Sequence, residues 1–199
     1  MDVITSQDTC INNHKLPVLK SSRNNGVSLI EMMVSLAIIS IVVIIGLPNL
    51  QNFFANNRLT TQTHEFIASM ALARSEAVKR GQDVVICKSS DGEYCVTDNG
   101  WEQGWLVYTD NNQNHIREEH EDILHLVTEL GGGTTARYSA FGSNHYIVYR
   151  SNGFTYTNGT LTFCSPGKPE LARSLILYKT GRLRAARTKP DGSQLNCHI

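Results

Sequence analysis

The chain lacks the short motifs on which most enzyme families are built. Its 199 residues contain no nucleophile elbow, phosphate loop, H-E-x-x-H motif or Rossmann glycine pattern. Internal repeats and low-complexity segments are missing as well. We therefore expect no enzyme and no cofactor, and the length suits one domain plus an appendage.

The chain also lacks a net charge, because 18 basic residues balance 18 acidic ones. Overall charge therefore indicates neither a nucleic-acid binder nor an acidic tail. The distribution is uneven, however. Residues 91–130 hold ten acids and one base, a net of −9, whereas residues 137–199 hold nine bases and two acids, a net of +7. Either the surface carries two regions of opposite potential, or these charges are simply solvated loops.

A close C-x-x-C pair is missing, which disfavours a zinc site built from thiolates. Five cysteines are present, an odd count. Cys10 lies in a segment that we expect to be removed, and the remaining four are compatible with two disulfides in an oxidising compartment. Three pairings are possible. We favour one local bridge and one that staples the C-terminal tail, namely Cys87 with Cys95 and Cys164 with Cys197.

A long stretch near the N-terminus is almost free of charge. Between Val27 and Asn57 the only charged residue is Glu31. Residues 32–51 are apolar on every side of a helix and supply the roughly 20 residues that span a bilayer. A secretory signal would end in small residues after its apolar core, whereas here a polar, basic segment, residues 1–25, comes first. This segment should stay in the cytoplasm, which places the C-terminal domain on the far side of the membrane.

The residues around Gly26 resemble a known processing signal. Gly26 followed by VSLIEMMVSLAII is similar to the class III signal of type IV pilins and of type II secretion pseudopilins. The resemblance implies that a prepilin peptidase cuts after Gly26 and that Val27, where Phe or Met is commoner, becomes the methylated first residue. Glu31 then falls at the fifth position, and Pro48 where many members carry a helix-kinking proline. It further implies a bacterial inner-membrane protein with a periplasmic domain, later assembled into a pilus or pseudopilus.

Glu31 has a physical role that fits this resemblance. A carboxylate within a bilayer costs several kcal/mol unless it is paired, so such residues usually have a function. In a helical filament the cheapest partner is the free α-amine of a neighbouring subunit. We therefore expect Glu31 to set the register between pilin subunits, the alternative being a stray acid near the membrane interface.

The pattern of apolar residues predicts an α+β fold. Phe66, Met70, Ala73 and Ala77 follow the spacing of one helix face, and Gly81 is a natural stop. Six short runs rich in β-branched and aromatic residues follow, separated by turn signals: DVVICK, GWLVYT, DILHLVTE, HYIVYR, GTLTFC and RSLILYK. We predict a long N-terminal transmembrane helix packed on an antiparallel β-sheet domain, as in type IV pilins.

The first part of the predicted sheet resembles one family in particular. The order of CKSSDGEYC and then WEQGWLVYTDNNQN is similar to the GspH/FimT group of minor pilins and pseudopilins, in which a cysteine-bearing hairpin precedes a G-W strand and a polar turn. The resemblance, closest to FimT, extends over most of residues 26–199. The divisions we expect are a leader (1–26), a long helix (27–80) with its membrane part near 32–51, and a β-rich domain with a basic tail (81–199).

A polar segment after the G-W strand has the spacing of a calcium loop. Positions 1, 3, 5 and 12 of an EF-hand-like loop carry oxygen-bearing side chains: Asp110, Asn112, Asn114 and Glu121. Because position 6 is His115 rather than glycine and the flanks are strand-like, we favour a polar hairpin loop over a metal site. A histidine site is disfavoured too, because a recurrence every five residues fits neither a helix face nor a strand face: His115, His120 and His125.

The C-terminal basic segment is the best functional candidate. Residues 173–189 contain six bases and no acid. Within it, Gly181-Arg182-Leu183-Arg184 resembles the G-R-x-R pattern of FimT-type minor pilins, which implies DNA binding during natural transformation. Glycine permits a tight turn, alternation places both arginines on one face, and guanidinium groups suit phosphate oxygens. We expect DNA contacts from five side chains: Arg182, Arg184, Arg187, Lys189 and Lys179.

These patterns support two functions. The first is a minor type IV pilin that binds extracellular double-stranded DNA non-specifically for uptake, with other pilin subunits, prepilin peptidase and the inner membrane as further partners. The second is a purely structural subunit, either a minor pilin or a GspH-like pseudopilin of a type II secretion system. In the second case the bases aid solubility or pair with the acidic region 91–130 of an adjacent subunit.

Overall fold

The described part of the chain forms one long helix followed by eight short strands. The computed structural model describes residues 26–98, 100–189 and 192–197, so most of the expected leader, with Cys10, lies outside the described residues. The chain divides into two units, one ending at Ile45 and one beginning at Gly46, and each is described by itself.

Helix α1, Leu29–Arg80, contains the whole apolar stretch. In the first unit, all side chains from Val27 to Ile45 are exposed. The most apolar 18-residue window of α1 has a mean hydropathy of 2.6 and none of it is buried, so the helix is long and apolar enough to cross a membrane by length and composition. The helix continues through position 48.

Helix α1 ends where the sequence predicts. The backbone N–H of Gly81 donates to the carbonyl oxygen of Ala77 at 3.0 Å, and Gly81 adopts a φ of +68°. This left-handed conformation is the usual way to end a helix, and glycine adopts it without steric cost.

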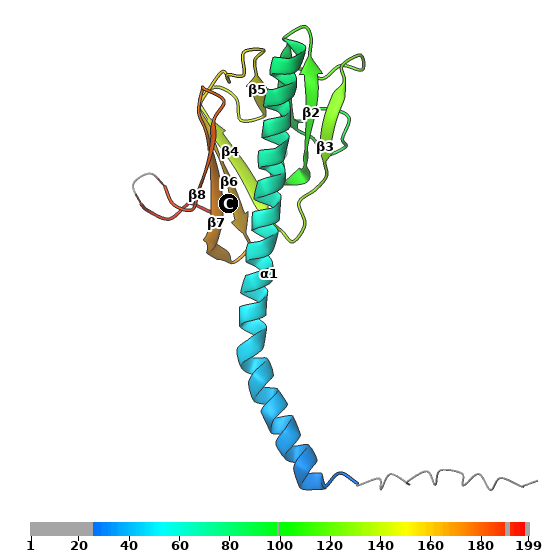
Figure 1. Ribbon diagram of the computed structural model, residues 1–199, viewed down its shortest axis with the longest axis vertical. Helices are drawn as coiled ribbons and strands as arrows, with labels where there is room; N and C mark the ends of the chain where they lie inside the picture. The colour runs from blue at the N-terminus through cyan, green and yellow to red at the C-terminus, as the bar shows by residue number, and fades with distance from the viewer. Residues whose placement is uncertain (1–25, 99, 190–191, 198–199) are drawn as a thin grey trace, which may run out of the picture. The chain divides into compact units, whose positions relative to one another are not determined.

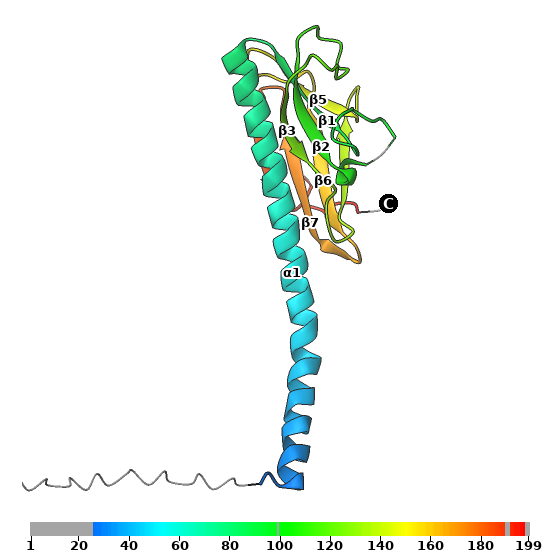
Figure 2. The same ribbon diagram turned by 90° about the vertical axis from the view of Figure 1, so that its right-hand side faces the viewer.

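The eight strands form two antiparallel sheets of four strands each (Figure 1). In order across the first sheet they are β3 (Ile123–Val127), β2 (Trp105–Asp110), β1 (Asp83–Lys88) and β5 (Tyr146–Tyr149). The second contains β4 (Thr135–Ala140), β6 (Gly159–Ser165), β7 (Lys168–Leu177) and β8 (Leu183–Ala186). A short 3-10 helix, η1 (Trp101–Gln103), precedes β2. The C-terminal part of α1 lies along one side of both sheets (Figures 1 and 2).

Six strands coincide with the six predicted runs, and the antiparallel arrangement is confirmed. The remaining strands, β4 and β8, were not predicted. Both lie at the edges of the second sheet, where β4 pairs with β6 and β8 pairs with β7. Their sequences, TARYSA and LRAA, carry few of the β-branched residues that favour strands, so pairing with a neighbour decides their conformation.

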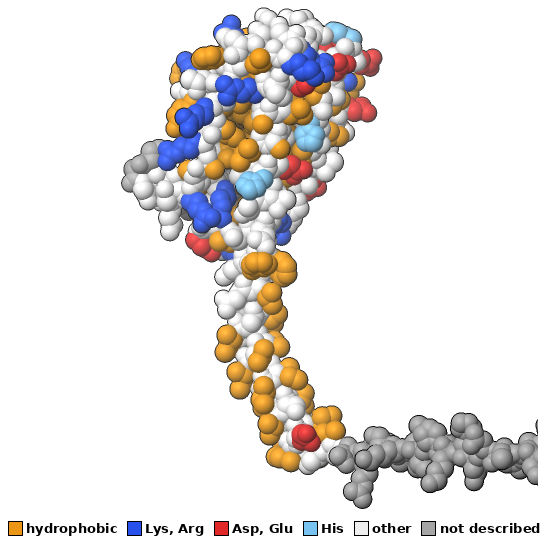
Figure 3. Space-filling model, viewed as in Figure 1, with side chains coloured by type: hydrophobic (Ala, Val, Ile, Leu, Met, Phe, Trp, Pro, Cys, Tyr) orange, Lys and Arg blue, Asp and Glu red, His pale blue; other side chains and the backbone are white. Residues whose placement is uncertain are grey.

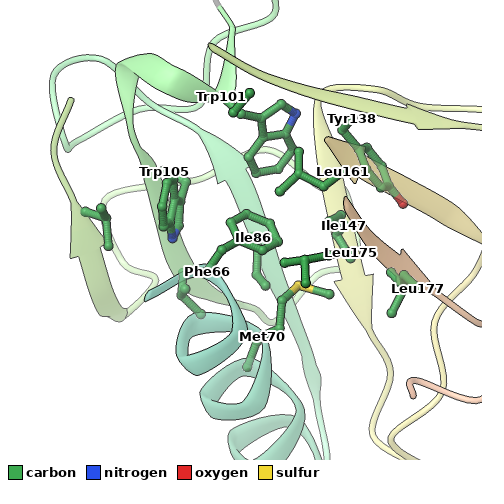
Figure 4. Packing of buried hydrophobic residues seen from close by; sticks show 14 of the residues in the cluster. Phe66, Met70, Ile86, Trp101, Trp105, Tyr138, Ile147, Leu161, Leu175 and Leu177 are labelled. Atoms are coloured by element: carbon green, nitrogen blue, oxygen red, sulfur yellow. The ribbon is translucent and has the colours of Figure 1, made fainter. Parts of the chain in front are cut away.

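One apolar core joins α1 to both sheets. The predicted face of α1 is buried in it: Phe66, Met70, Ala73 and Ala77 are all at most 1% exposed. Figure 4 shows Phe66 and Met70 pointing towards residues of both sheets. The Phe66 ring makes edge-on contacts with Trp105 (5.0 Å between centroids), Trp101 (5.7 Å) and Phe163 (6.0 Å). The helix therefore closes the space between the two sheets.

Phe66→Ala should destabilise the domain by about 3–5 kcal/mol, because it empties a ring-sized volume where both sheets meet α1. The measurement is urea-induced unfolding of the full chain in neutral detergent, followed by tryptophan fluorescence. Val78→Ala is the matched control, since Val78 lies on the same helix but is 54% exposed. A loss of stability as small for Phe66→Ala as for Val78→Ala would contradict this description of the core.

Candidate functional site

The processing signature lies at the start of α1. Gly26 and Val27 are exposed and precede the helix, which begins at Leu29. Glu31 lies in the first turn and is exposed. A carboxylate in this position is favoured by the partial positive charge of a helix N-terminus. The expected cleavage after Gly26 and the expected pairing of Glu31 involve other molecules and stay predictions.

Both favoured disulfides are present in the structure. Cys87 on β1 is bonded to Cys95 in the following loop, with 5.6 Å between their Cα atoms. Cys164 on β6 is bonded to Cys197, with a Cα separation of 5.8 Å. Leu195 packs with Cys164 and Ala172 in a small cluster of its own. The second bridge thus fastens the C-terminal tail to the sheet that carries β8.

The G-R-x-R motif forms the turn and the first half of a β-hairpin strand. The backbone N–H of Gly181 donates to the carbonyl of Tyr178 (2.8 Å), and that of Tyr178 donates to the carbonyl of Arg182 (3.0 Å). Gly181 adopts a φ of +75°, and a Cβ built there would lie 2.1 Å from the carbonyl oxygen of Gly153. The motif therefore needs glycine for two reasons, its left-handed backbone and the close approach of another chain segment.

Arg74 of α1 forms hydrogen bonds to the backbone of this turn. Its guanidinium donates through Nη1 to the carbonyl of Gly181 (3.2 Å) and through Nη2 to that of Thr180 (3.1 Å). The buried hydroxyl of Tyr149 donates to the same Gly181 carbonyl (3.2 Å). No local pattern predicts this role, because Arg74 stands more than 100 positions away from the turn.

Arg182 and Arg184 lie on one exposed face, as predicted. Arg184 is opposite Ile176 of β7, and both arginine side chains are open to solvent. They line an open hollow together with Tyr178, Thr180 and Leu183. Lys179, in the same turn, is also exposed. Figure 3 shows lysine and arginine side chains gathered along the edge of the domain that carries β8, with most acidic side chains towards the opposite edge.

The structure does not bring Arg187 onto the face of Arg182 and Arg184. Arg187 is also exposed, but it lines a pocket between β8 and α1 with His64 and Arg173. Burial, and secondarily the positive charge of Arg187, lowers the pKa of Arg173. The Arg173 guanidinium also donates to the side-chain oxygen of Asn56 on α1. The basic segment thus has two faces, one with Arg182 and Arg184 and one beside the helix, where Arg187 is also exposed to solvent.

Lys189 lies at the border of the basic segment and the tail. Its Nζ donates to the side-chain oxygen of Asn196 at 3.1 Å, and its backbone N–H donates to the carbonyl of Ser193. It is partly exposed. The tail that the Cys164–Cys197 bridge fastens therefore also positions this lysine.

The acidic segment, residues 110–121, connects β2 to β3. It joins two strands that pair antiparallel, so it is the connection of a β-hairpin, as expected. Asp110 and Glu121 are nonetheless buried, at 0% and 2% exposure. Of the three regularly spaced histidines, one belongs to a group of potential ligands in the described part of the chain, His120 with Glu118 and Glu121.

Tyr108 lies beside the acidic segment and is fully buried. Burial raises the pKa of Tyr108, and the nearby negative charges of Asp110 and Glu121 raise it further. Its hydroxyl has no hydrogen-bond partner among the described residues. From the sequence, Tyr108 is predicted to lie in a strand, and no pattern indicates a functional role for it.

Two segments of the chain match known protein families. Residues 21–47 match the prokaryotic N-terminal methylation motif, and residues 62–181 match the family described as type II transport protein GspH. Among curated proteins, a sequence comparison finds no significant match.

Two kinds of solved structure are similar. A crystal structure of the type IV minor pilin FimU of Pseudomonas aeruginosa PAO1 has a TM-score of 0.53 and 22% identity, covering 67% of this chain and 92% of that one. The minor pseudopilin EpsH from the type II secretion system of Vibrio cholerae has a TM-score of 0.48 and 16% identity, covering 65% of this chain and 96% of that one.

The methylation motif, the exposed apolar helix and the two antiparallel sheets define a pilin-like subunit, in the class of the minor pilins and pseudopilins of type IV pili or type II secretion. The chain belongs to the GspH family, whose match spans more than half of its length.

Gly181→Ala should destabilise the domain more than Gly167→Ala does. Both glycines have a positive φ, which costs alanine about 1–2 kcal/mol. Only at Gly181 would the new Cβ also collide with backbone, because nothing lies within 4 Å of the position at Gly167. Urea unfolding of the full chain in detergent measures both variants. Equal losses of stability would contradict the described turn.

Proposed function

We propose that this protein is a minor type IV pilin that binds extracellular double-stranded DNA through Arg182 and Arg184 for uptake in natural transformation. The observation that carries the proposal is the pair of exposed arginines on one face of the β7–β8 hairpin. We further propose that the domain is periplasmic before assembly and that prepilin peptidase cleaves between Gly26 and Val27.

The electrostatics of the hairpin suit a polyanion. No acid occurs between residues 173 and 189, so no nearby carboxylate competes for the arginines within this segment. Guanidinium groups bind phosphate oxygens in bidentate fashion. Contacts of this kind read no bases, and the affinity expected for non-specific binding is on the order of 10⁻⁴–10⁻⁶ M at physiological salt. Weak, sequence-independent binding is what capture of arbitrary DNA requires.

The supporting contacts favour a pre-organised site. Arg74 and Tyr149 both bond the carbonyl of Gly181, directly before Arg182. The backbone that carries Arg182 is therefore fixed before DNA arrives, which reduces the ordering cost of binding. Lys179 lies in the same turn, and we propose it as a third, weaker contact.

Arg182→Gln combined with Arg184→Gln should weaken DNA binding about tenfold or more and lower the slope of log K against log salt by about 2, since each lost phosphate contact removes about 0.9. The assay is fluorescence anisotropy of labelled, random-sequence duplex DNA with the full chain in neutral detergent. A salt series gives the slope.

Two control variants make this test specific. Lys79→Gln with Arg150→Gln removes the same two charges from exposed positions outside the basic segment and should leave the affinity nearly unchanged. Arg187→Gln should weaken binding less than substitution of either Arg182 or Arg184 does, because Arg187, although exposed, lies beside the α1 pocket and not on their face. An unaltered affinity and slope in the Arg182/Arg184 double variant would refute the DNA-binding proposal.

A purely structural role is the second candidate, and the family description favours it, because GspH is a type II transport protein. The two candidate functions predict different results when a deletion strain is complemented with the Arg182/Arg184 double variant. If DNA capture is the function, the Arg182/Arg184 double variant restores pili or secretion but not transformation. If the role is structural, the same variant restores every lost function.

Glu31→Ala should abolish or strongly reduce incorporation into filaments, because the assembled subunit would lose the intramembrane charge pair proposed for Glu31. Glu31→Gln tests whether the charge itself is needed. The matched control is Ser35→Ala in the same apolar stretch, where the hydroxyl donates to the carbonyl of Glu31 in its own helix. Incorporation is measured by immunoblotting of sheared surface filaments. Normal incorporation of Glu31→Ala would contradict the role of the acid in assembly.

A further inference from the structure

The loop between β2 and β3 buries two carboxylates, and its one arginine, Arg117, lies over the Tyr94 ring, 5.8 Å from Cζ to the ring centroid, rather than in an ion pair with them. Asp110 is 0% exposed and Glu121 is 2% exposed. In residues 26–98, 100–189 and 192–197, no lysine or arginine forms an ion pair with either. The ion pair that Asp110 does make is with His115, whose Nδ1 lies 2.8 Å from Oδ2 and is charged only when protonated. Burying like charges together is costly unless a cation compensates them.

The oxygen-bearing side chains of this loop meet one another. Asn112 and Asn114 both approach the Glu118 carboxylate, with their Nδ2 atoms 2.8 and 3.3 Å from its oxygens. Glu121 accepts hydrogen bonds from the backbone N–H groups of Asn111 (3.0 Å) and Glu118 (3.1 Å). The acid at the end of the loop is thereby tied to both its beginning and its middle.

The loop has a positive φ at position 6, where calcium loops usually carry glycine, although glycine is absent here. His115, at position 6, has a φ of +60°. Its backbone N–H donates to Asp110 Oδ2 (3.0 Å), and its ring packs against Tyr146 and Tyr156, with centroids 5.0 and 5.7 Å apart. These contacts hold a histidine in a conformation that glycine adopts more easily. A positive φ at position 6 therefore does not require glycine in this loop, although the loop is flanked by strands β2 and β3, as the sequence predicts, and not by helices.

A buried hydroxyl beside the loop is an independent sign of a polar ligand at this place. The hydroxyl of Tyr108 is buried and, within the described part of the chain, bonds to nothing. Tyr108 stands two residues before Asp110 on β2, so both side chains lie on the same face of the strand. The hydroxyl is also close to the charges of Glu121 and Glu118. A buried hydroxyl without a partner costs about 1–3 kcal/mol, so this position calls for an additional polar group.

We propose that residues 110–121 bind one calcium ion. The ligands are side-chain oxygens of Asp110, Asn112, Asn114 and Glu121 and the backbone carbonyl of Ile116. Glu118 acts through a water molecule that also hydrogen-bonds the Tyr108 hydroxyl. An all-oxygen set of this size suits calcium, which takes 6–8 oxygens in flexible geometry, better than magnesium, which demands a strict octahedron, or zinc, which prefers nitrogen and sulfur. The ion neutralises the buried acids and fixes the β2–β3 hairpin.

The test uses the full chain in neutral detergent, stripped with EGTA and then titrated with calcium chloride. Calcium should raise the melting temperature and displace terbium, whose luminescence is sensitised by the nearby tyrosines. Half-saturation should fall near 10⁻⁴–10⁻³ M, as in extracellular calcium modules. Magnesium at the same concentrations should have a much smaller effect.

Substitutions of the proposed ligands test whether calcium binds at this loop. Glu121→Gln should weaken calcium binding at least tenfold, whereas Glu119→Gln, the same charge change at an exposed position in the loop, should not. Asn112→Ala should also weaken calcium binding. Because Asn112 is exposed, this variant keeps the test valid if the buried Glu121→Gln fails to fold. Tyr108→Phe should stabilise the calcium-free protein and reduce the rise in melting temperature on adding calcium.

Two outcomes would overturn the proposal. One is a wild-type protein whose melting temperature and terbium luminescence do not respond to calcium at millimolar concentration. The other is a response that Glu121→Gln and Asn112→Ala retain, or that Glu119→Gln loses to the same extent as they do. None of these outcomes depends on DNA binding, so each of the two proposals can be refuted without affecting the other.

Discussion

The packing of one apolar face of α1 against both sheets is the interaction on which the rest of the domain depends. Phe66 touches aromatic rings from η1, β2 and β6, so a single side chain connects the first sheet with the second. Neither four-stranded sheet could bury its inner face alone, because a sheet needs a second layer to cover it. The same helix that carries the apolar N-terminal stretch therefore also completes the core, and its length follows from serving both purposes.

The helix also supports the β7–β8 hairpin, which carries Lys179, Arg182 and Arg184 and is called the basic hairpin below. Arg74 lies on α1 one turn from the buried Met70 and bonds the turn that carries the G-R-x-R motif. A helix fixed in the core is a rigid support for a functional turn, and turns on rigid scaffolds hold side chains in a defined direction. The side chains of the exposed arginines make no such contact within the described part of the fold, whereas Arg74 and Gly181 are tied to it by hydrogen bonds and close backbone approach.

Opposite charges gather at different places on the domain (Figure 3). The basic hairpin lies at the β8 edge of the second sheet, and the acidic loop lies between β2 and β3 of the first. The bases are exposed, whereas Asp110 and Glu121 are buried. Exposed charges suit a large, hydrated polyanion, and buried ones suit a small ion that can enter a loop. The uneven charge along the sequence therefore corresponds to two regions of the domain that differ in sign and in burial.

Much of this protein was determined by local sequence alone. The charge-free stretch with Glu31, the α1 face of Phe66 and Met70, and six of the eight strands could be predicted, because hydrophobic periodicity and turn residues act over a few positions. Tertiary structure alone decided the rest. It made β4 and β8 strands through pairing, turned Arg187 away from the outer arginines, placed Arg74 under Gly181, and left the Tyr108 hydroxyl unpaired beside buried acids. These features arise from contacts between residues far apart in the chain, and no local pattern encodes such contacts.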